Sequence, residues 1–355
     1  RVADERVAQD LGILGQETTG PGGVAYGLRT VPVAMRIAER VVATAPDAWV
    51  INFTNPAGMV TEAMSAVLGD RVIGICDSPI AMCRRVARAL GVEAEHPWFD
   101  YVGLNHMGWL RSVQVRGREE LPRLLADDAM AESFEEGRLF GAEWLRVLGA
   151  VPNEYLWYWY FRREAVASVG GHNGTTRGGF LLTQQERFYE TVDRNPAGAL
   201  DEWQRVRRER DASYLAETRG PAAQPRDEDD VEGGGYERVA LELMAAIARD
   251  ERSVHILNVR NRGAVTGLDD DAVVEIPCLV DRNGAHPVAA STVAEHQLGL
   301  MLSVKAVERE TIAAALEGSR ARALRAFALH PMVDSVSTAR RLLEGYERAV
   351  PELRK

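Results

Sequence analysis

The sequence predicts an α/β fold in which a short parallel sheet is joined to a larger, mostly helical α+β region. Two observations support this. First, a buried strand running into "INFTNP", a helix over "GMVTEAMSAVLG" and a second buried strand, "RVIGIC", follow one another with short turns between them. This order is typical of parallel strands with helices on the faces of the sheet. Second, helical patterns dominate after residue 80, with strand-like runs only around 99–116 and 272–280.

The remaining elements follow in chain order. Residues 3–12 are predicted to be helical, and "GILGQETTGPGGVAYGLRT" is predicted to be a glycine-rich loop. A helix is expected from Pro32 to Ala43, because its apolar residues recur at helical spacing and a proline stands at its start. Residues 216–235 are poor in apolar side chains and predict a mobile loop or lid. A helix should begin at Tyr236, and residues 290–350 should pack as helices in a bundle or an oligomer.

Composition excludes several classes of protein. The chain has 355 residues, 46% of them hydrophobic and 26% charged, as in an ordinary globular protein. No apolar run approaches the roughly 18 residues that span a bilayer, and no signal peptide is evident. A net charge of −10 argues against nucleic acid as the main partner. The 3 cysteines lack CxxC spacing and are odd in number, which favours a reducing cytoplasm.

A thiol, an acid and an imidazole follow predicted strands. Cys76 and Asp77 close the apolar strand in "RVIGICDSPI", and His106 lies at the centre of "YVGLNHMGW". Ligands bind beyond the carboxyl ends of parallel strands. A thiol and an imidazole there would together bind a soft-to-borderline divalent metal, with the acid facing its open side. The alternative is packing, because a lone buried cysteine or histidine is often only part of a core.

Other polar residues have two interpretations each. Tyr236 opens a helix after three glycines, either as a capping aromatic or as a general base whose phenolate the helix dipole favours. Glu17 organises a turn or binds a ligand, and Asn55 is a turn residue or orients a sugar hydroxyl. Arg262, in "NVRNRG", meets an anion or is a solvated surface residue. The aromatic run "EYLWYWYF" is interpreted as core or interface.

Six motifs in order resemble glycoside hydrolase family 4. They are "GQETTGPGG", "INFTNPAG", "GICDSP", "YVGLNHMGW", "GGGY" and "VTGLDDDAVVEIP", and they cover essentially the whole chain. The family comprises 6-phosphoglucosidases and related enzymes that depend on NAD and a divalent metal, usually Mn²⁺, and it is an exception to two-carboxylate glycoside hydrolysis. The resemblance implies oxidation at C3 of the sugar by NAD, removal of the C2 proton, elimination at C1 and addition of water.

The resemblance also implies roles for the residues considered above. Cys76 and His106 look like the metal ligands. Tyr236 looks like the base at C2, and Asp77 like the acid that protonates the leaving oxygen. The metal-ligand and base roles are among the open interpretations of the residues themselves, whereas the role of Asp77 at the leaving oxygen is implied by the resemblance alone.

Further residues would contact the sugar, its phosphate or NAD. Asn55 and Asn105 look like sugar contacts. Arg1 stands where the family has a phosphate-binding arginine, and Arg262 is a second candidate for the phosphate. Glu17 and Asn55 are the candidates on the cofactor side.

The resemblance gives the fold in more detail. It implies the remainder of a Rossmann-type domain, residues 1–78, and a substrate, metal and oligomerisation domain, residues 79–355, in a fold resembling that of lactate and malate dehydrogenases. The chain begins with Arg1 and holds nothing like GxGxxG. We therefore expect a missing nucleotide-binding half-domain on the order of 90 residues. A homo-oligomer, dimer or tetramer, is also expected.

The motifs favour a 6-phospho-β-glucosidase acting on a phosphorylated glucoside. Asp77 is the residue type found in the α-glucosidase branch, so a 6-phospho-α-glucosidase or an α-galactosidase is the alternative within the family. Outside it, the alternatives are an NAD-dependent 2-hydroxy acid dehydrogenase and a sugar-phosphate sensor without catalysis.

Overall fold

A computed structural model describes residues 1–16, 18–94, 96–171, 176–214 and 235–354. Within these residues one mixed sheet runs in the order β1-β2-β7-β8-β3-β4-β5, with β6 paired to β4 and β9 to β8. The strands are β1 (Val50–Asn52), β2 (Val72–Gly74), β3 (Trp98–Leu104), β4 (Met107–Val115), β5 (Arg118–Glu119), β6 (Val151–Pro152), β7 (Ser253–Arg260), β8 (Val273–Asp281) and β9 (Gly284–Pro287).

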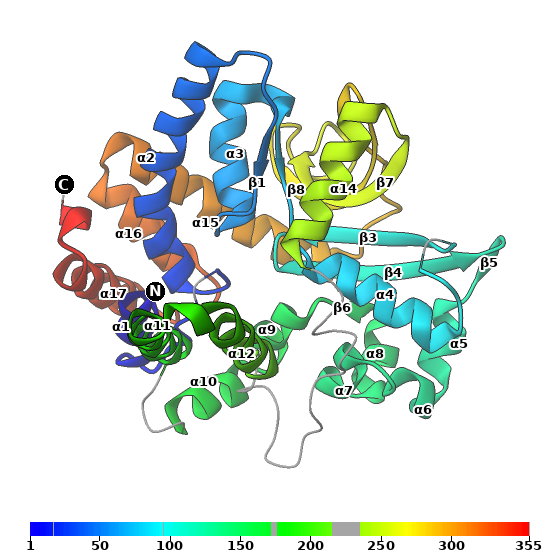
Figure 1. Cartoon of the computed structure of the whole chain (residues 1–355), viewed down its shortest axis with the longest axis horizontal. Helices are drawn as coiled ribbons and strands as arrows, with labels where there is room; N and C mark the ends of the chain where they lie inside the picture. The colour runs from blue at the N-terminus through cyan, green and yellow to red at the C-terminus, as the bar shows by residue number, and fades with distance from the viewer. Residues whose placement is uncertain (17, 95, 172–175, 215–234, 355) are drawn as a thin grey trace.

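Helices surround this sheet. Figure 1 shows α2 and α3 side by side, with α15, α16 and α17 beyond them and α14 on the other side of β1. The longer helices are α1 (Val2–Gln9), α2 (Pro21–Thr44), α3 (Ala57–Leu68), α4 (Ser78–Leu90), α10 (Arg162–Gly171), α11 (Arg177–Arg194), α12 (Ala199–Ala212), α14 (Tyr236–Arg249), α15 (Glu295–Glu317), α16 (Arg320–Leu329) and α17 (Val336–Ala349). The shorter ones are α5 (Leu121–Ala126), α6 (Asp128–Ala131), α7 (Glu135–Phe140), α8 (Ala142–Leu148) and α9 (Trp157–Tyr160).

The predicted parallel unit is confirmed. Strands β1 and β2 pair in parallel, with Ile51 opposite Ile73, and α3 connects them. The rest of the sheet is antiparallel, and β7 joins it to β2 where Asn258 pairs with Gly74. The carboxyl ends of β1 and β2 therefore lie at the same edge of the sheet, and Cys76 follows directly after that edge.

The expected loop before Pro32 is wrong over most of its length. Helix α2 begins at Pro21 and continues through Pro32 to Thr44. Pro21 suits the first helical turn, and the missing N–H of Pro32 costs one helical hydrogen bond without ending the helix. The glycines here serve packing: a Cβ on Gly27 would lie 2.4 Å from Sδ of Met59, so glycine lets α2 approach α3 closely.

Other expectations have mixed outcomes. The helix predicted at 3–12, the strand at 272–280 and the C-terminal helices are confirmed as α1, β8 and α15 to α17. The run 99–116 is two strands, β3 and β4, joined by a turn at Asn105 and His106. Strand β7 was not predicted, and the loop predicted at 216–235 lies, except for Gly235, outside the described residues.

A domain boundary at residue 78 stays a prediction. One sheet contains strands from both sides of it, and the main hydrophobic core includes Ile73 and Ile75 together with Trp109 and Ile276. Among the described residues, none of the helices combines the length and the apolar character needed to cross a membrane.

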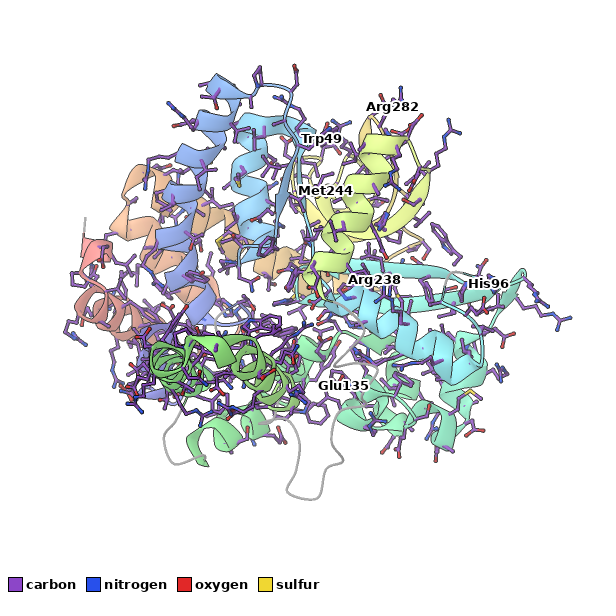
Figure 2. The ribbon with its side chains drawn as sticks, viewed as in Figure 1. Trp49, His96, Glu135, Arg238, Met244 and Arg282 are labelled. Atoms are coloured by element: carbon purple, nitrogen blue, oxygen red, sulfur yellow. The ribbon has the colours of Figure 1, made fainter. Side chains whose placement is uncertain are left out.

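Gly284→Ala should destabilise the protein by about 1–3 kcal/mol. Gly284 has φ +105°, and a Cβ there would lie 2.2 Å from the ring of Trp49, which Figure 2 shows near the turn that carries Arg282. Gly299→Ala is the matched control: it is exposed in α15 with open space around it, and should stabilise by about 0.5–1 kcal/mol. Urea unfolding measures both, and equal effects would contradict the assignment.

Candidate active site

Cys76 and Asp77 lie where β2 passes into α4. Strand β2 is fully buried, and Ile75 still donates its N–H to the carbonyl of Asn52 at 2.9 Å, so the chain reaches Cys76 in an extended path. Helix α4 then begins with Asp77 as its N-cap residue, but the Asp77 side chain does not bond to the first turn. The carboxylate instead approaches Gly235: a Cβ there would lie 3.3 Å from Oδ2 of Asp77.

Tyr236 opens α14 beside this pair. Its Oη lies 3.9 Å from Sγ of Cys76, so the structure brings together three residues that the sequence proposed. Their charges act on each other. The pKa of Tyr236 is raised, first by Cys76, then by burial and by Asp77. The pKa of Cys76 is also raised, first by burial and then by Glu275 and Asp77, which outweighs a hydrogen bond from the N–H of Ser78.

His106 stands in the two-residue turn between β3 and β4. Its φ is +61°, a conformation in which histidine is among the more frequent non-glycine residues. The side chain is buried, and burial lowers its pKa to about 3, so the imidazole is neutral. Nδ1 lies 2.7 Å from Oγ1 of Thr18, and the ring of Tyr155 stacks on it at 3.7 Å between centroids.

Asn105 is held by a buried carboxylate that sequence reasoning missed. Glu275, near the start of β8, accepts hydrogen bonds from Asn105 (3.3 Å), Asn258 (2.8 Å) and the hydroxyl of Tyr101 (2.9 Å). Burial raises the pKa of Glu275 to about 7, although these three donors oppose the rise. The sequence signal that could have identified Glu275 is the single acid inside the apolar run "AVVEIPCLV", because a buried acid needs hydrogen-bond partners.

Glu154 is a second buried carboxylate beside the site, also missed. It accepts a short hydrogen bond from Ser78, the residue after Asp77, and its other oxygen has no hydrogen-bond partner in the described part of the chain. Burial, and then Glu136, raise the pKa of Glu154 to about 7. Tyr214 lies 3.4 Å from Glu154 and bonds the Tyr155 hydroxyl at 2.7 Å. The turn that carries Asp77 is thus joined to the aromatic ring that covers His106.

Asn55 lies in the turn after β1, at the same edge of the sheet as Cys76. Its Oδ1 is buried and has no hydrogen-bond partner among the described residues. Phe53, in the same turn, is 58% exposed, and its ring centroid lies 5.7 Å from that of Tyr236. An unsatisfied amide oxygen at the carboxyl end of a parallel strand fits a group that binds a ligand.

The structure carries Arg262 away from this group. Arg262 forms an ion pair with Asp70, at the amino end of β2 and therefore at the opposite edge from Cys76. Arg1 bonds Glu5 at 2.9 Å through Nε and packs against Gly178 of α11. Glu17 lies outside the described residues.

The residues present fit a divalent cation with few protein ligands. Among the described residues, no group of three or more His, Cys, Asp or Glu side chains is arranged to hold a metal ion. Cys76 nevertheless offers a thiol that would become a thiolate on binding a cation, and His106 offers a neutral imidazole; both ligand types suit a borderline cation. The acidic surroundings that raise the pKa of Cys76 would also be relieved by a positive charge there.

The metal-free protein should lose stability as pH rises through about 7. Burial raises the pKa of Glu275 from 4.5 to about 7, so the folded state holds this proton more tightly than the unfolded chain. This contribution to stability is fully present below pH 4.5 and is lost as pH rises through about 7. Urea unfolding in EDTA across that range measures it, and Glu275→Gln should flatten the dependence. If stability falls with pH just as steeply in Glu275→Gln, the assignment to Glu275 is contradicted. A smaller pH dependence should remain in this variant, because the pKa of Glu154 is also raised to about 7.

Comparison with known proteins agrees with this geometry. Residues 1–92 match the family model described as Family 4 glycosyl hydrolase, and residues 101–333 match its C-terminal domain. A probable 6-phospho-beta-glucosidase of Bacillus subtilis (strain 168) is 31% identical over 97% of this chain and 74% of that protein. The 6-phospho-beta-glucosidase of Escherichia coli (strain K12) is 30% identical over 99% of this chain and 76% of that protein.

Solved structures show the same fold. The 6-phospho-beta glucosidase from Thermotoga maritima, with manganese, NAD+ and glucose-6-phosphate, superposes with a TM-score of 0.79 at 28% identity, over 99% of this chain and 77% of that one. A 6-phospho-alpha-glucosidase from gut microorganisms, in complex with NAD and Mn2+, gives 0.74 at 26% identity, over 98% and 76% of the two chains.

Proposed function

The chain belongs to family 4 of the glycosyl hydrolases, and on this premise we propose that it hydrolyses 6-phosphorylated glucosides with NAD and a divalent metal ion, Mn²⁺. The observation that carries the proposal is the contact between Cys76 and Tyr236 at 3.9 Å, with Asp77 beside them. A thiol, a phenol and a carboxyl in contact at the carboxyl ends of parallel strands serve a metal-assisted proton transfer better than they serve packing.

Cys76 and His106 would hold the metal ion, and Asn55 would contact NAD and the sugar. When bound, NAD accepts a hydride from C3 and the metal ion withdraws electron density from the neighbouring oxygens, so that the proton on C2 becomes acidic. The proton transfers and the orientation of the sugar are carried out by this chain's own side chains.

Tyr236 takes the proton from C2. Its phenol is partly buried at the start of α14, where the helix dipole favours the phenolate once the negative charge of Cys76 is compensated. Asp77 gives a proton to the leaving oxygen at C1. Asn105 orients a sugar hydroxyl, and Glu275 holds its amide at 3.3 Å. Arg1 remains a candidate for the phosphate, whereas the position of Arg262 beside Asp70 does not support that role.

We propose the β-anomer as the preferred substrate, following the motifs. The test compares cellobiose-6-phosphate with maltose-6′-phosphate, each with and without Mn²⁺ and NAD. Hydrolysis of cellobiose-6-phosphate that requires both cofactors supports the proposal, as does uptake of deuterium at C2 from heavy water. Preference for maltose-6′-phosphate would assign the α-anomer. Net NADH formation from a hydroxy acid would indicate a dehydrogenase, and binding of glucose-6-phosphate without turnover would indicate a sensor.

The proposed cytoplasmic location is supported by Cys76, Cys83 and Cys278, which are buried and unpaired. A homo-oligomer, dimer or tetramer, stays a proposal that light scattering of the purified protein tests.

A further inference from the structure

We propose that Thr18 and Tyr155 are positioning residues that fix the imidazole of His106 so that its Nε2, and not Nδ1, is offered to a divalent metal ion. The inference rests on the proposed function only in assigning the metal to His106. It adds two residues from distant parts of the chain, one in the loop before α2 and one after β6.

The hydroxyl of Thr18 occupies one of the two ring nitrogens. Its Oγ1 lies 2.7 Å from Nδ1 of His106, across 88 positions of sequence. The same hydroxyl lies 3.1 Å from Oε1 of Gln16 and can direct its own proton there. It then accepts the proton of Nδ1–H, and the lone pair of the neutral imidazole is left on Nε2. A hydrogen bond to the second nitrogen is how metal-binding histidines are generally oriented.

Tyr155 fixes the plane of the imidazole. Its ring lies parallel to that of His106, with 6° between the planes and 3.7 Å between the centroids. The Tyr155 hydroxyl is bonded to Tyr214 at 2.7 Å, so the covering ring is itself held. Stacking alone would allow the imidazole to turn over about its Cβ–Cγ bond, which exchanges Nδ1 with Cδ2 and Nε2 with Cε1. The Thr18 bond opposes that turn, so the two contacts are complementary.

Hydrogen bonds to Gln16 hold Thr18 in place. Oε1 of Gln16 accepts the N–H of Thr18 (2.6 Å), the N–H of Thr19 (2.7 Å) and the hydroxyl of Thr19 (2.6 Å). Gly22 lets the start of α2 approach this loop, since a Cβ there would lie 2.7 Å from the carbonyl oxygen of Gln16. Thr18 and Thr19 therefore share Oε1 of Gln16 as an acceptor. Of their two hydroxyls, that of Thr18 bonds His106.

This difference provides a matched control. Thr18→Val removes the hydroxyl at His106, Thr18→Ser keeps it, and Thr19→Val removes a loop hydrogen bond of the same kind. The purified protein with NAD is titrated with Mn²⁺, free Mn²⁺ is measured by electron paramagnetic resonance, and thermal unfolding confirms that each variant is folded. We expect Thr18→Val to weaken Mn²⁺ binding about 10- to 100-fold, with Thr18→Ser and Thr19→Val close to the unmodified protein.

Tyr155 is tested in the same assay. Tyr155→Phe keeps the stacked ring and should bind Mn²⁺ nearly as well as the unmodified protein, whereas Tyr155→Leu should bind it several-fold more weakly. Hydrolysis by Thr18→Val should recover at saturating Mn²⁺, because the residue acts through His106 and not on the substrate.

Two results would overturn the inference while leaving the proposed function intact. Equal losses in Thr18→Val and Thr19→Val would mean that Thr18 only stabilises its loop. Undiminished Mn²⁺ binding in Thr18→Val would mean that His106 is oriented by other contacts. An unmodified protein that neither binds Mn²⁺ nor hydrolyses phosphorylated glucosides would refute the proposed function, and the inference with it.

Discussion

Tyr236→Phe should abolish exchange of the C2 hydrogen with solvent and lower hydrolysis about 100- to 10,000-fold, the range for loss of a general base. The substitution removes one oxygen atom and keeps the ring that packs against Phe53 at 5.7 Å. The phenol touches Cys76 at 3.9 Å but is not one of the proposed metal ligands, so the affinity for Mn²⁺ should change little. Proton removal would then fail in a protein that still binds its cofactors.

Deuterium incorporation from heavy water measures this directly, in parallel with hydrolysis and Mn²⁺ titration. Tyr160→Phe is the control, because this substitution also removes a phenol hydroxyl, but one that accepts its hydrogen bond from the indole of Trp109. Residual C2 exchange near the unmodified rate in Tyr236→Phe would show that another group is the base. A loss of Mn²⁺ binding in Tyr236→Phe as large as the loss of hydrolysis would show that the phenol is instead part of the metal site.

The parts of this site that the sequence predicted are those with a local signal. Cys76 and Asp77 follow an apolar strand directly, and Tyr236 follows three glycines at the start of a helix. Strand ends and helix starts are decided within a few residues, so their side chains can be assigned to one edge of a sheet before the fold is known. The contact between Cys76 and Tyr236 shows that these two positions meet in the fold, while their roles stay predictions.

The supporting residues lacked such a signal. Thr18 meets His106 across 88 positions, and Glu275 meets Tyr101 across 174. No pattern within a short window indicates which distant partner a polar side chain will bond. Tyr155 stands in an aromatic run whose interpretation as core was reasonable, since the ring is buried, yet one of its faces covers an imidazole.

Arg262 and α2 show two further limits of prediction from the sequence. An arginine in a loop is attractive for a phosphate, but the antiparallel pairing of β7 with β2 carries that loop to the edge opposite Cys76. The glycines before Pro32 indicate a loop by composition, whereas Gly27 is required by the close contact with Met59 of a neighbouring helix. Both depend on which elements become neighbours, which is decided by tertiary packing.

Asp77→Asn should lower hydrolysis of cellobiose-6-phosphate about 100- to 10,000-fold and that of a nitrophenyl glucoside-6-phosphate much less, within about tenfold. A sugar hydroxyl must be protonated as it departs, whereas a nitrophenolate leaves readily without a proton. The Asp77 side chain makes no capping hydrogen bond to the first turn of α4, and asparagine has nearly the same shape, so α4 should form and the protein should keep its stability. The two substrates thus separate loss of an acid from loss of structure within one variant.

Exchange of the C2 hydrogen should persist in Asp77→Asn, because Tyr236 removes that proton before the leaving oxygen departs. The opposite pattern is expected of Tyr236→Phe, in which both substrates fail together. An equal loss on both substrates in Asp77→Asn would assign Asp77 to shaping the site around Cys76, where its charge already raises the pKa of the thiol after burial and Glu275. The ratio of the two rates therefore distinguishes an acid that acts on the leaving group from a carboxylate that acts on its neighbours.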